Sequence, residues 1–260
     1  MYTCSAMRRL VCLFGVLALA PALAWSQGTY TTNFPLTENP ISEGGKWIGG
    51  QNAGGNLWGN VQTTPGLAFG VSEPTQYGDA TAILTGAWGQ IQTAMATVKI
   101  NVRPSSCCHE VEVRLRSTIS THNINGYEIL CPVHSNPGYG VQVVRWNGAN
   151  GDYVYLPCTG SLCSVAHQCS SGDVIKATAS GTNPVTIVVN LNGSDVVTAT
   201  DNGSAYNGPG GAAGPWTSGS PGIGFYDNQD NNWNYFGFSS FTATDGQGPA
   251  PPTNLTATPQ

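Results

Sequence analysis

The chain reads DVIKATASGTNPVTIVVNLNGSDVVTAT from residue 173 to residue 200. Val, Ile and Thr fill three short runs, at 173–180, 184–191 and 194–200, and Gly, Asn or Pro lies between the runs. Short β-branched runs separated in this way are typical of strands and turns. Asn192-Gly193 alone separates the last two runs, and Asn-Gly in that setting is the strongest local signal of a β-hairpin. The stretch therefore predicts three successive strands, the last two joined by a tight turn.

The same texture continues through most of the chain, and no segment sustains helical periodicity over three turns. Asn147-Gly148 gives a second hairpin signal. Many short, evenly spaced strands in roughly 220 residues indicate an all-β fold, a β-sandwich or jelly roll. The further predicted strands are 80–84, 90–102, 110–117, 126–133, 140–146, 153–156, 222–226 and 235–242.

Charge is scarce in this sequence. It has 9 Lys and Arg against 14 Asp and Glu, together 9% of 260 residues, and a formal net charge of −5. About 25% charged residues is ordinary for a soluble domain. Coiled coils and solvated helical bundles need charged faces, and disordered tails need net charge, so the composition argues against both. Nucleic-acid binding is also disfavoured, because nine basic residues supply no positive surface for phosphates.

Residues 1–24 have the organisation of a secretory signal peptide. Arg8 and Arg9 precede an apolar run from residue 10 to residue 20, and Ala22-Leu23-Ala24 supplies the small residues that signal peptidase recognises. The apolar run is shorter than the roughly 20 residues that a spanning helix needs. We therefore expect cleavage after Ala24, no membrane insertion, and a secreted protein, with the periplasm as the alternative destination.

Six cysteines follow the signal peptide, an even number that suits disulfide formation in an oxidising compartment. Zinc binding is the alternative, because His109 and His167 are close to cysteines, but the spacings match no common zinc motif. Disulfides are favoured, and six cysteines allow 15 pairings among which the sequence does not choose. Their clustering predicts that they staple one region of a sheet and a long loop. The cysteines are Cys107, Cys108, Cys131, Cys158, Cys163 and Cys169.

Composition changes again near the C-terminus. Residues 246–252 read GQGPAPP, which is typical of an extended linker stiffened by proline. Residues 253–259 read TNLTATP and resemble the first strand of a fibronectin type III module. We therefore predict one large domain over 25–245. A linker and the start of a second module would follow over 246–260, as part of a larger extracellular protein.

Several short motifs occur in a characteristic order along the large domain. They are NFPL at 33–36, GKW at 45–47, GY at 126–127, VVRWNG at 143–148, GDVIKA at 172–177, LNG at 191–193 and SPGIG at 220–224. In this order they resemble the concanavalin A-like lectin/glucanase superfamily, specifically its laminin-G-like and DUF1080-like secreted bacterial β-sandwiches. The resemblance implies a jelly roll of two antiparallel sheets whose concave face often binds or cleaves polysaccharide. Lectins, binding modules, hydrolases and lyases share this fold, so the resemblance does not decide function.

Charge concentrates in one predicted strand, at Glu110, Glu112, Arg114 and Arg116. Alternate residues of a strand share a face, so these four side chains are expected on one side while the apolar residues between them enter the core. Carboxylates two residues apart on a strand are separated by about 7 Å, within the range found between the two acids of glycosidases. Glu110 and Glu112 are therefore a candidate catalytic pair, although the Glu-x-Asp-x-x-Glu pattern of the glucanases is incomplete here.

Two other interpretations of this strand stay open. Its face could bind a ligand without catalysis, through Arg114 and Arg116 together with Glu128 and Arg145 on neighbouring strands. Alternatively, these side chains could pair with one another as a cross-strand ion ladder, with no ligand at all. A polysaccharide lyase of the same fold is the enzymatic alternative to a hydrolase.

Aromatic residues mark a second candidate site. Trp146 lies in one hairpin with Tyr153 and Tyr155, and Tyr226 and Trp233 flank an Asn/Asp-rich segment at 227–232. Aromatic rings stack on the C–H faces of sugars, while Asn, Asp and Gln bond the hydroxyls. We therefore expect Trp146, Tyr226 and Trp233 to contact a glycan. The phenylalanines assigned to the core instead are Phe225, Phe236, Phe238 and Phe241.

The sequence requires no cofactor. The family resemblance alone implies a structural calcium ion, with Asn33, Glu43 and Asp245 as candidate oxygen ligands where the first and last strands meet.

These features favour a secreted carbohydrate-binding or adhesion module with a polysaccharide or glycan as its partner, and neither nucleic acid nor membrane insertion. A polysaccharide-degrading enzyme using Glu110 and Glu112, and a structural extracellular spacer, are the alternatives.

Overall fold

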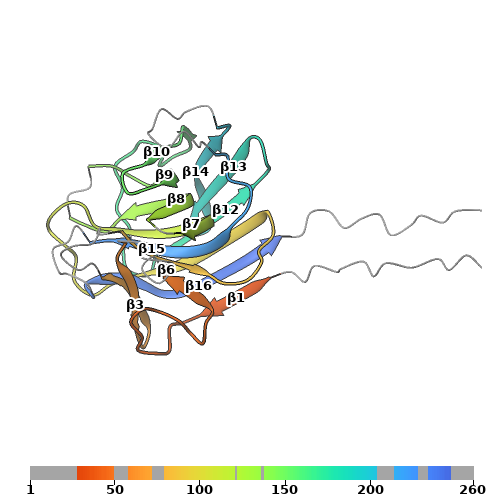
Figure 1. The fold of residues 1–260 in the computed structure, drawn as a ribbon. Coiled ribbons are helices and arrows are strands. Elements are labelled where there is room, and N and C mark those ends of the chain that lie inside the picture. The colour runs from red at the N-terminus through yellow and green to blue at the C-terminus, as the bar shows by residue number, and fades with distance from the viewer. Residues whose placement is uncertain are drawn as a thin grey trace, which may run out of the picture.

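The computed structural model describes residues 28–49, 58–71, 79–120, 122–135, 138–203, 214–227 and 234–246. Within them, the strands form two antiparallel sheets that pack face to face (Figure 1). This is the β-sandwich that the sequence predicts. No helix able to cross a lipid bilayer occurs in this part of the chain. The predicted signal peptide (1–24), Trp233 and residues 247–260 of the predicted linker and second module lie outside the described residues.

The larger sheet has the order β11-β14-β13-β12-β6-β16-β4-β3, and β1 also pairs with β16. Its strands are β1 (Thr29–Thr32), β3 (Asn60–Thr64), β4 (Leu67–Val71), β6 (Ile91–Ile100), β11 (Cys158–Thr159), β12 (Val174–Ser180), β13 (Val185–Leu191), β14 (Ser194–Asp201) and β16 (Phe236–Gly246). The smaller sheet has the order β10-β9-β8-β7-β15-β5-β2. Its strands are β2 (Trp47–Gly49), β5 (Asp79–Leu84), β7 (Glu110–Ser120), β8 (Asn123–Pro132), β9 (Gln142–Gly148), β10 (Tyr153–Tyr155) and β15 (Ser220–Tyr226).

The hydrophobic core lies between the two sheets. The smaller sheet contributes Val111, Val113 and Leu115 from β7, and all three are fully buried, as predicted. The Phe238 ring of β16 lies 5.2 Å from the Phe225 ring of β15 in the opposite sheet. The four phenylalanines assigned to the core from the sequence are all buried. Burial of each such side chain stabilises the fold by about 1.5–3 kcal/mol, so this layer fixes which face of each sheet points inward.

The predicted strands are all present, with ends shifted by a few residues. Asn192-Gly193 makes the predicted tight turn between β13 and β14, and both residues have positive φ, 53° and 88°. Asn147-Gly148 does not form a turn, because both residues belong to β9 and the chain turns after them. There the Asp152 amide donates to the Ala149 carbonyl at 2.9 Å. The short strands β1 to β4 and β11 were not predicted.

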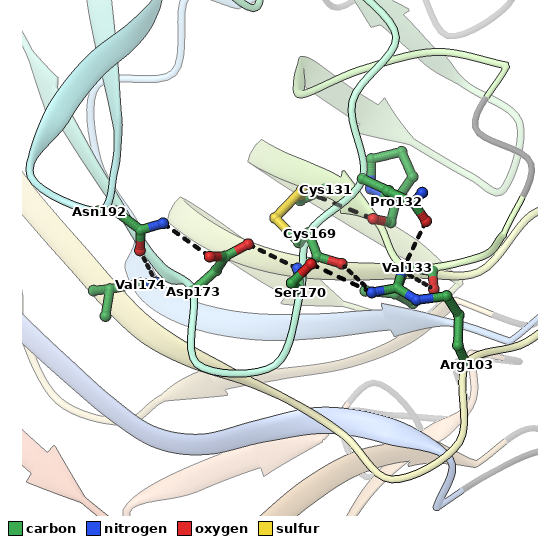
Figure 2. The surroundings of a disulfide bond; sticks show 10 residues. Arg103, Cys131, Pro132, Val133, Cys169, Ser170, Asp173, Val174 and Asn192 are labelled. Atoms are coloured by element: carbon green, nitrogen blue, oxygen red, sulfur yellow. Dashed lines mark hydrogen bonds between the residues drawn. A yellow bond between two sulfur atoms is a disulfide. The ribbon is translucent and has the colours of Figure 1, made fainter.

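Three disulfides pair the six cysteines of the domain: Cys107–Cys108, Cys131–Cys169 and Cys158–Cys163. The Cys131–Cys169 bond ties the end of β8 to the loop before β12 (Figure 2). At the same junction, the Arg103 guanidinium donates to the carbonyls of Val133 and Cys169, at 2.9 and 3.1 Å. The predicted stapling of a sheet and a long loop is confirmed. In the disulfide-bonded chain these six sulfur atoms are not available as zinc ligands.

A β-bulge between Leu115 and Thr118 interrupts the alternation of β7. Arg116 lies in this bulge with a φ of 50°, and its guanidinium is directed at backbone carbonyls next to the larger sheet. It donates to the carbonyl oxygens of Gln90 at 2.8 Å and Gly181 at 3.0 Å. The prediction that Arg116 shares a face with Glu110 and Glu112 is therefore wrong, because the bulge reverses the direction of the side chain.

Arg145 also lies on the inner side of its sheet. Its strand partner is Tyr127, and its guanidinium forms an ion pair with Asp201 at the end of β14. The Tyr127 hydroxyl donates to the other Asp201 oxygen at 2.8 Å. These buried side chains link the two sheets. The predicted ladder between Arg145 and Glu128 is wrong, because Glu128 follows Tyr127 in the strand and faces the opposite side.

The inter-sheet contact can be tested by replacing Asp201 with Ala. We expect the free energy of unfolding to fall by about 3–5 kcal/mol, because the substitution leaves the Arg145 guanidinium buried without its carboxylate. Urea denaturation measures the change. Thr200→Ala, at the exposed neighbouring position, is the matched control and should change stability by less than about 0.5 kcal/mol. Similar losses in both variants would show that the ion pair has no special part in holding the sheets together.

Candidate functional site

Charged residues gather on the outward face of the smaller sheet. Glu110, Glu112 and Arg114 lie on this face of β7, as predicted, while the residues between them enter the core. The strand register adds Asp79 from β5, in the row of Glu110, and Glu128 from β8, directly beside Arg114. Four carboxyl groups and one guanidinium therefore share the middle of one sheet face.

The Arg114 guanidinium is the centre of this cluster. Its Nη2 atom lies 2.5 Å from Glu112 Oε2, 3.1 Å from Glu128 Oε2 and 3.4 Å from Asp79 Oδ1. Arg114 and Glu112 are fully buried. Oxygen atoms of the three acids lie within 4.8 Å of one another, close enough to hold a metal ion, but the guanidinium already contacts all three. A cross-strand ion ladder was one of the interpretations of this strand. It is present in part, but some of its residues differ from those predicted.

Gly224 makes room for this ion cluster. It lies on β15 opposite Glu112, and a Cβ atom there would come within 2.1 Å of Glu112 Oε2 and 2.6 Å of Arg114 Nε. Any side chain at this position would therefore displace the ion pair.

A cavity of about 480 Å³ opens over the same face. Three acids line it, Asp79, Glu110 and Glu128, whereas Glu112 and Arg114 do not. The Tyr139 hydroxyl donates to Glu110 Oε1 inside this space. The other lining residues among those described are Cys108, Leu130, Val144, Trp146, Asn150, Gly151, Tyr153, Tyr155 and Tyr226. The two carboxylates predicted as a pair are therefore separated: Glu110 is in the cavity and Glu112 is engaged with Arg114.

Burial and crowding of like charges raise the pKa values of these acids. The pKa of Glu110 rises to about 8, mainly through burial and then through repulsion by Glu128, although the Tyr139 hydrogen bond opposes the rise. The pKa of Asp79 rises to about 7 for the same two reasons, against the attraction of Arg114. At neutral pH, Glu110 is thus mostly protonated. It can donate a hydrogen bond, transfer a proton, or give the proton up to a positive neighbour.

Aromatic side chains form the walls of the cavity. The Trp146 indole donates to Glu128 Oε2 at 2.5 Å, and its ring lies 4.8 Å from the Trp58 ring and 4.9 Å from the Tyr153 ring. Trp146 is only 3% exposed, so it is a wall and not an open platform. Tyr153 and Tyr155, at 40% and 53% exposure, present the open aromatic surface beside it. Tyr226 lines the cavity, as its predicted contact with a ligand requires.

Two residues of the site were missed in the sequence. Asp79 stands alone among apolar and small residues at the start of β5, and only the pairing of β5 with β15 brings it to the site. Tyr139 lies in the irregular stretch before β9, where no periodic pattern indicates direction. Cys108, of the vicinal disulfide, was predicted as a structural cysteine and also lines the cavity.

Two of the three residues suggested for calcium, Glu43 and Asp245, accept hydrogen bonds from protein donors. Glu43 accepts hydrogen bonds from Thr32 Oγ1 at 2.6 Å and from the Trp47 indole at 3.2 Å. Asp245 accepts from the backbone amide of Gly89 at 2.8 Å, and Asn33 is exposed. Calcium at this end of the domain stays a prediction.

Comparison with known proteins places the fold. No family model and no curated protein matches the chain. Among solved structures, β-agarase A in complex with oligoagarose superposes with a TM-score of 0.50 at 12% identity, covering 85% of this chain and 93% of that one. The carbohydrate-binding module CBM66 from Bacillus subtilis gives 0.45 at 13% identity, covering 79% and 95%. The metal-free carbohydrate recognition domain of Emp46p gives 0.48 at 10% identity, covering 84% and 97%.

The chain has a β-sandwich fold of two antiparallel sheets, similar to that of β-agarase A. This confirms the jelly-roll sandwich predicted from the order of motifs. Identities this low support the fold alone, so the chemistry of the site has to be argued from its own residues. The fibronectin type III segment stays a prediction.

Glu110 gives the site a measurable pH signature. Its pKa is higher in the folded chain, about 8, than the ordinary value of 4.5, so the folded state keeps a proton that the unfolded chain has lost between these values. The Glu110 carboxyl therefore makes its full contribution to the free energy of unfolding below about pH 4.5, and this contribution falls as the pH rises toward 8. The loss in the free energy of unfolding is at most about 1.4 kcal/mol for each unit of difference between the folded and unfolded pKa values of Glu110. We expect the melting temperature of Glu110→Gln to fall less than that of the parent between these pH values.

Asp195→Asn, at an exposed carboxylate of β14, is the control for this pH series. It should reproduce the pH trend of the parent chain. An identical pH trend in Glu110→Gln and the parent would show that the Glu110 carboxyl is not perturbed in the folded state.

Proposed function

We propose that this domain is a non-catalytic carbohydrate-binding module, exported from the cell, that holds a polysaccharide or glycan in the cavity on the outward face of the smaller sheet. The single observation that supports it is the composition of the cavity. Carboxyl groups and the Asn150 side chain offer partners for hydroxyl groups, and tyrosines with Trp146 offer flat apolar faces. Pockets with aromatic walls and a few convergent polar groups are the usual form of ligand sites.

The fold shared with β-agarase A, whose structure was determined in complex with oligoagarose, supports this proposal. The spacer alternative explains the paired Arg114 and Glu112, but it gives no reason for a cavity whose walls are five aromatic rings.

A hydrolase is the second candidate, and one observation favours it. Glu110 holds a proton near neutral pH and lies in the cavity with Asp79 and Glu128, as a general acid would. Its partner would be Asp79 or Glu128 and not Glu112. Glu110→Gln that binds polysaccharide as the parent does but stops the release of reducing ends would establish the enzyme; absence of turnover in the parent on every binding polymer would exclude it.

The binding proposal predicts that Tyr155→Ala weakens retention in native gels containing soluble polysaccharides. Tyr155 is the most exposed of the described aromatic residues that line the cavity. Loss of such an anchor usually reduces affinity by about 1 kcal/mol or more, or roughly fivefold to tenfold. Leu36→Ala is the matched control, because Leu36 is similarly exposed at 47% and does not line the cavity. Equal mobility of parent and Tyr155→Ala on every polymer that retards the parent would place binding elsewhere.

A further inference from the structure

Acidic groups outnumber basic groups at the cavity. Asp79, Glu110 and Glu128 line it, and Glu112 is buried against Arg114, so this face holds four carboxyl groups and one guanidinium. Asp227, which follows Tyr226 and is 1% exposed, adds further repulsion on Asp79. In a chain with only 14 acidic residues, this is a strong local excess.

Among the described residues, no basic side chain lines the cavity. The remaining Lys and Arg of the described residues do not line the cavity; they are Lys46, Lys99, Arg103, Arg116, Arg145 and Lys176. The internal segments that lie outside the described residues contain no Lys, Arg or His in their sequence. His134 contacts the Tyr139 ring, with centroids 6.1 Å apart, but does not line the cavity. Within the described part of the chain, protons or a ligand are thus the remaining sources of positive charge at the cavity.

The aromatic walls favour the same kind of ligand. Tyr and Trp rings attract a cation placed over their faces, by about 0.5–2 kcal/mol for each pair depending on exposure. Tyr139, Trp146, Tyr153, Tyr155 and Tyr226 all line the cavity beside the carboxyl groups. Rings and carboxylates around one space form a site that suits an ammonium group better than a neutral hydroxyl.

We propose that the cavity recognises a cationic glycan, a polymer of amino sugars whose amines are free and charged. The proposal rests on the proposed carbohydrate-binding function and names the class of sugar. An amino sugar offers an ammonium group to the carboxylates and an apolar ring face to the tyrosines. The raised pKa of Glu110 agrees with this, because an ammonium group replaces the proton as the source of positive charge.

Other cations fit less well. A divalent metal would need Asp79, Glu112 and Glu128 together, and the Arg114 Nη2 atom already contacts these three acids. A lysine side chain of a protein partner would fill only a small part of a cavity of about 480 Å³, whereas a sugar ring with its amine uses both walls and acids. An acidic glycan would meet more carboxyl groups than basic groups at the cavity, and the ionised ones would repel it.

The experiment compares two ligands that differ only in charge. Isothermal titration of the whole chain at neutral pH uses a tetramer of β-1,4-linked glucosamine and the same tetramer fully N-acetylated. We expect the charged tetramer to bind at least about tenfold more tightly, the equivalent of roughly 1.4 kcal/mol. Added sodium chloride should reduce this preference, because ions screen partly exposed charges.

Glu128→Gln tests the residues that carry the preference. It removes one carboxylate of the cavity while keeping an oxygen acceptor for Trp146, so we expect the charged tetramer to lose about fivefold in affinity and the acetylated tetramer to change by less than twofold. Asp195→Asn removes an exposed carboxylate of the other sheet and should leave both affinities unchanged. A melting curve of each variant confirms that it is folded.

The outcomes separate this inference from the function on which it rests. Equal or tighter binding of the acetylated tetramer, or binding of neutral or acidic glycans alone, overturns the cationic specificity and leaves the carbohydrate-binding function standing. No binding of any glycan overturns both. Tighter binding of a tetralysine peptide than of the glucosamine tetramer overturns the glycan in favour of a basic peptide.

Discussion

The ion cluster around Arg114 constrains the strand register of the smaller sheet. Removing charges from water is expensive unless they are paired, and Arg114 contacts three carboxylates at 2.5–3.4 Å. The reverse face of the same strand is the hydrophobic core. A shift of β7 by one residue would move Glu112 and Arg114 into that core, so the register of the sheet is specified from both faces at once. Gly224 meets the remaining requirement, since only a residue without Cβ leaves space for the ion pair.

The cluster explains its own members but not Glu110. Arg114 contacts Glu112, Glu128 and Asp79. Glu110 is instead held by the Tyr139 hydroxyl in a cavity, where burial and then the neighbouring acids raise the pKa of its carboxyl. A cluster that served stability alone would gain from an apolar residue at this position. Sites where local stability is sacrificed are typically sites of function. A ligand that binds only the folded chain returns that stability through the binding free energy.

The alternation of apolar and polar residues along the strands determined which parts of the structure the sequence could predict. Alternation placed Val111 and Val113 in the core and Glu110 and Glu112 opposite them, and Asn192-Gly193 fixed one hairpin. Two features of the structure could not be predicted from this alternation. A bulge, which has no sequence signature here, turned Arg116 inward, and pairing between strands distant in the chain brought Asp79 to Glu110. Alternation gives the face of a side chain but neither its depth nor its neighbours across the sheet. The site was therefore found in part, and its composition was not.

The burial of the carboxyl groups also helps to distinguish glycan binding from glycoside hydrolysis at this site. A glycosidase needs two carboxyl groups in one cavity, one protonated and one ionised at the same pH. Glu110 fits the first role. Asp79 fits the second poorly, because burial and repulsion by Glu128 raise its pKa to about 7. Glu128 is engaged through Oε2 with both Trp146 and Arg114. Several carboxyl groups are crowded beside aromatic rings in this cavity. This crowding weakens an acid and base pair, but it attracts a positive ligand. Binding therefore accounts for more of the geometry than catalysis does.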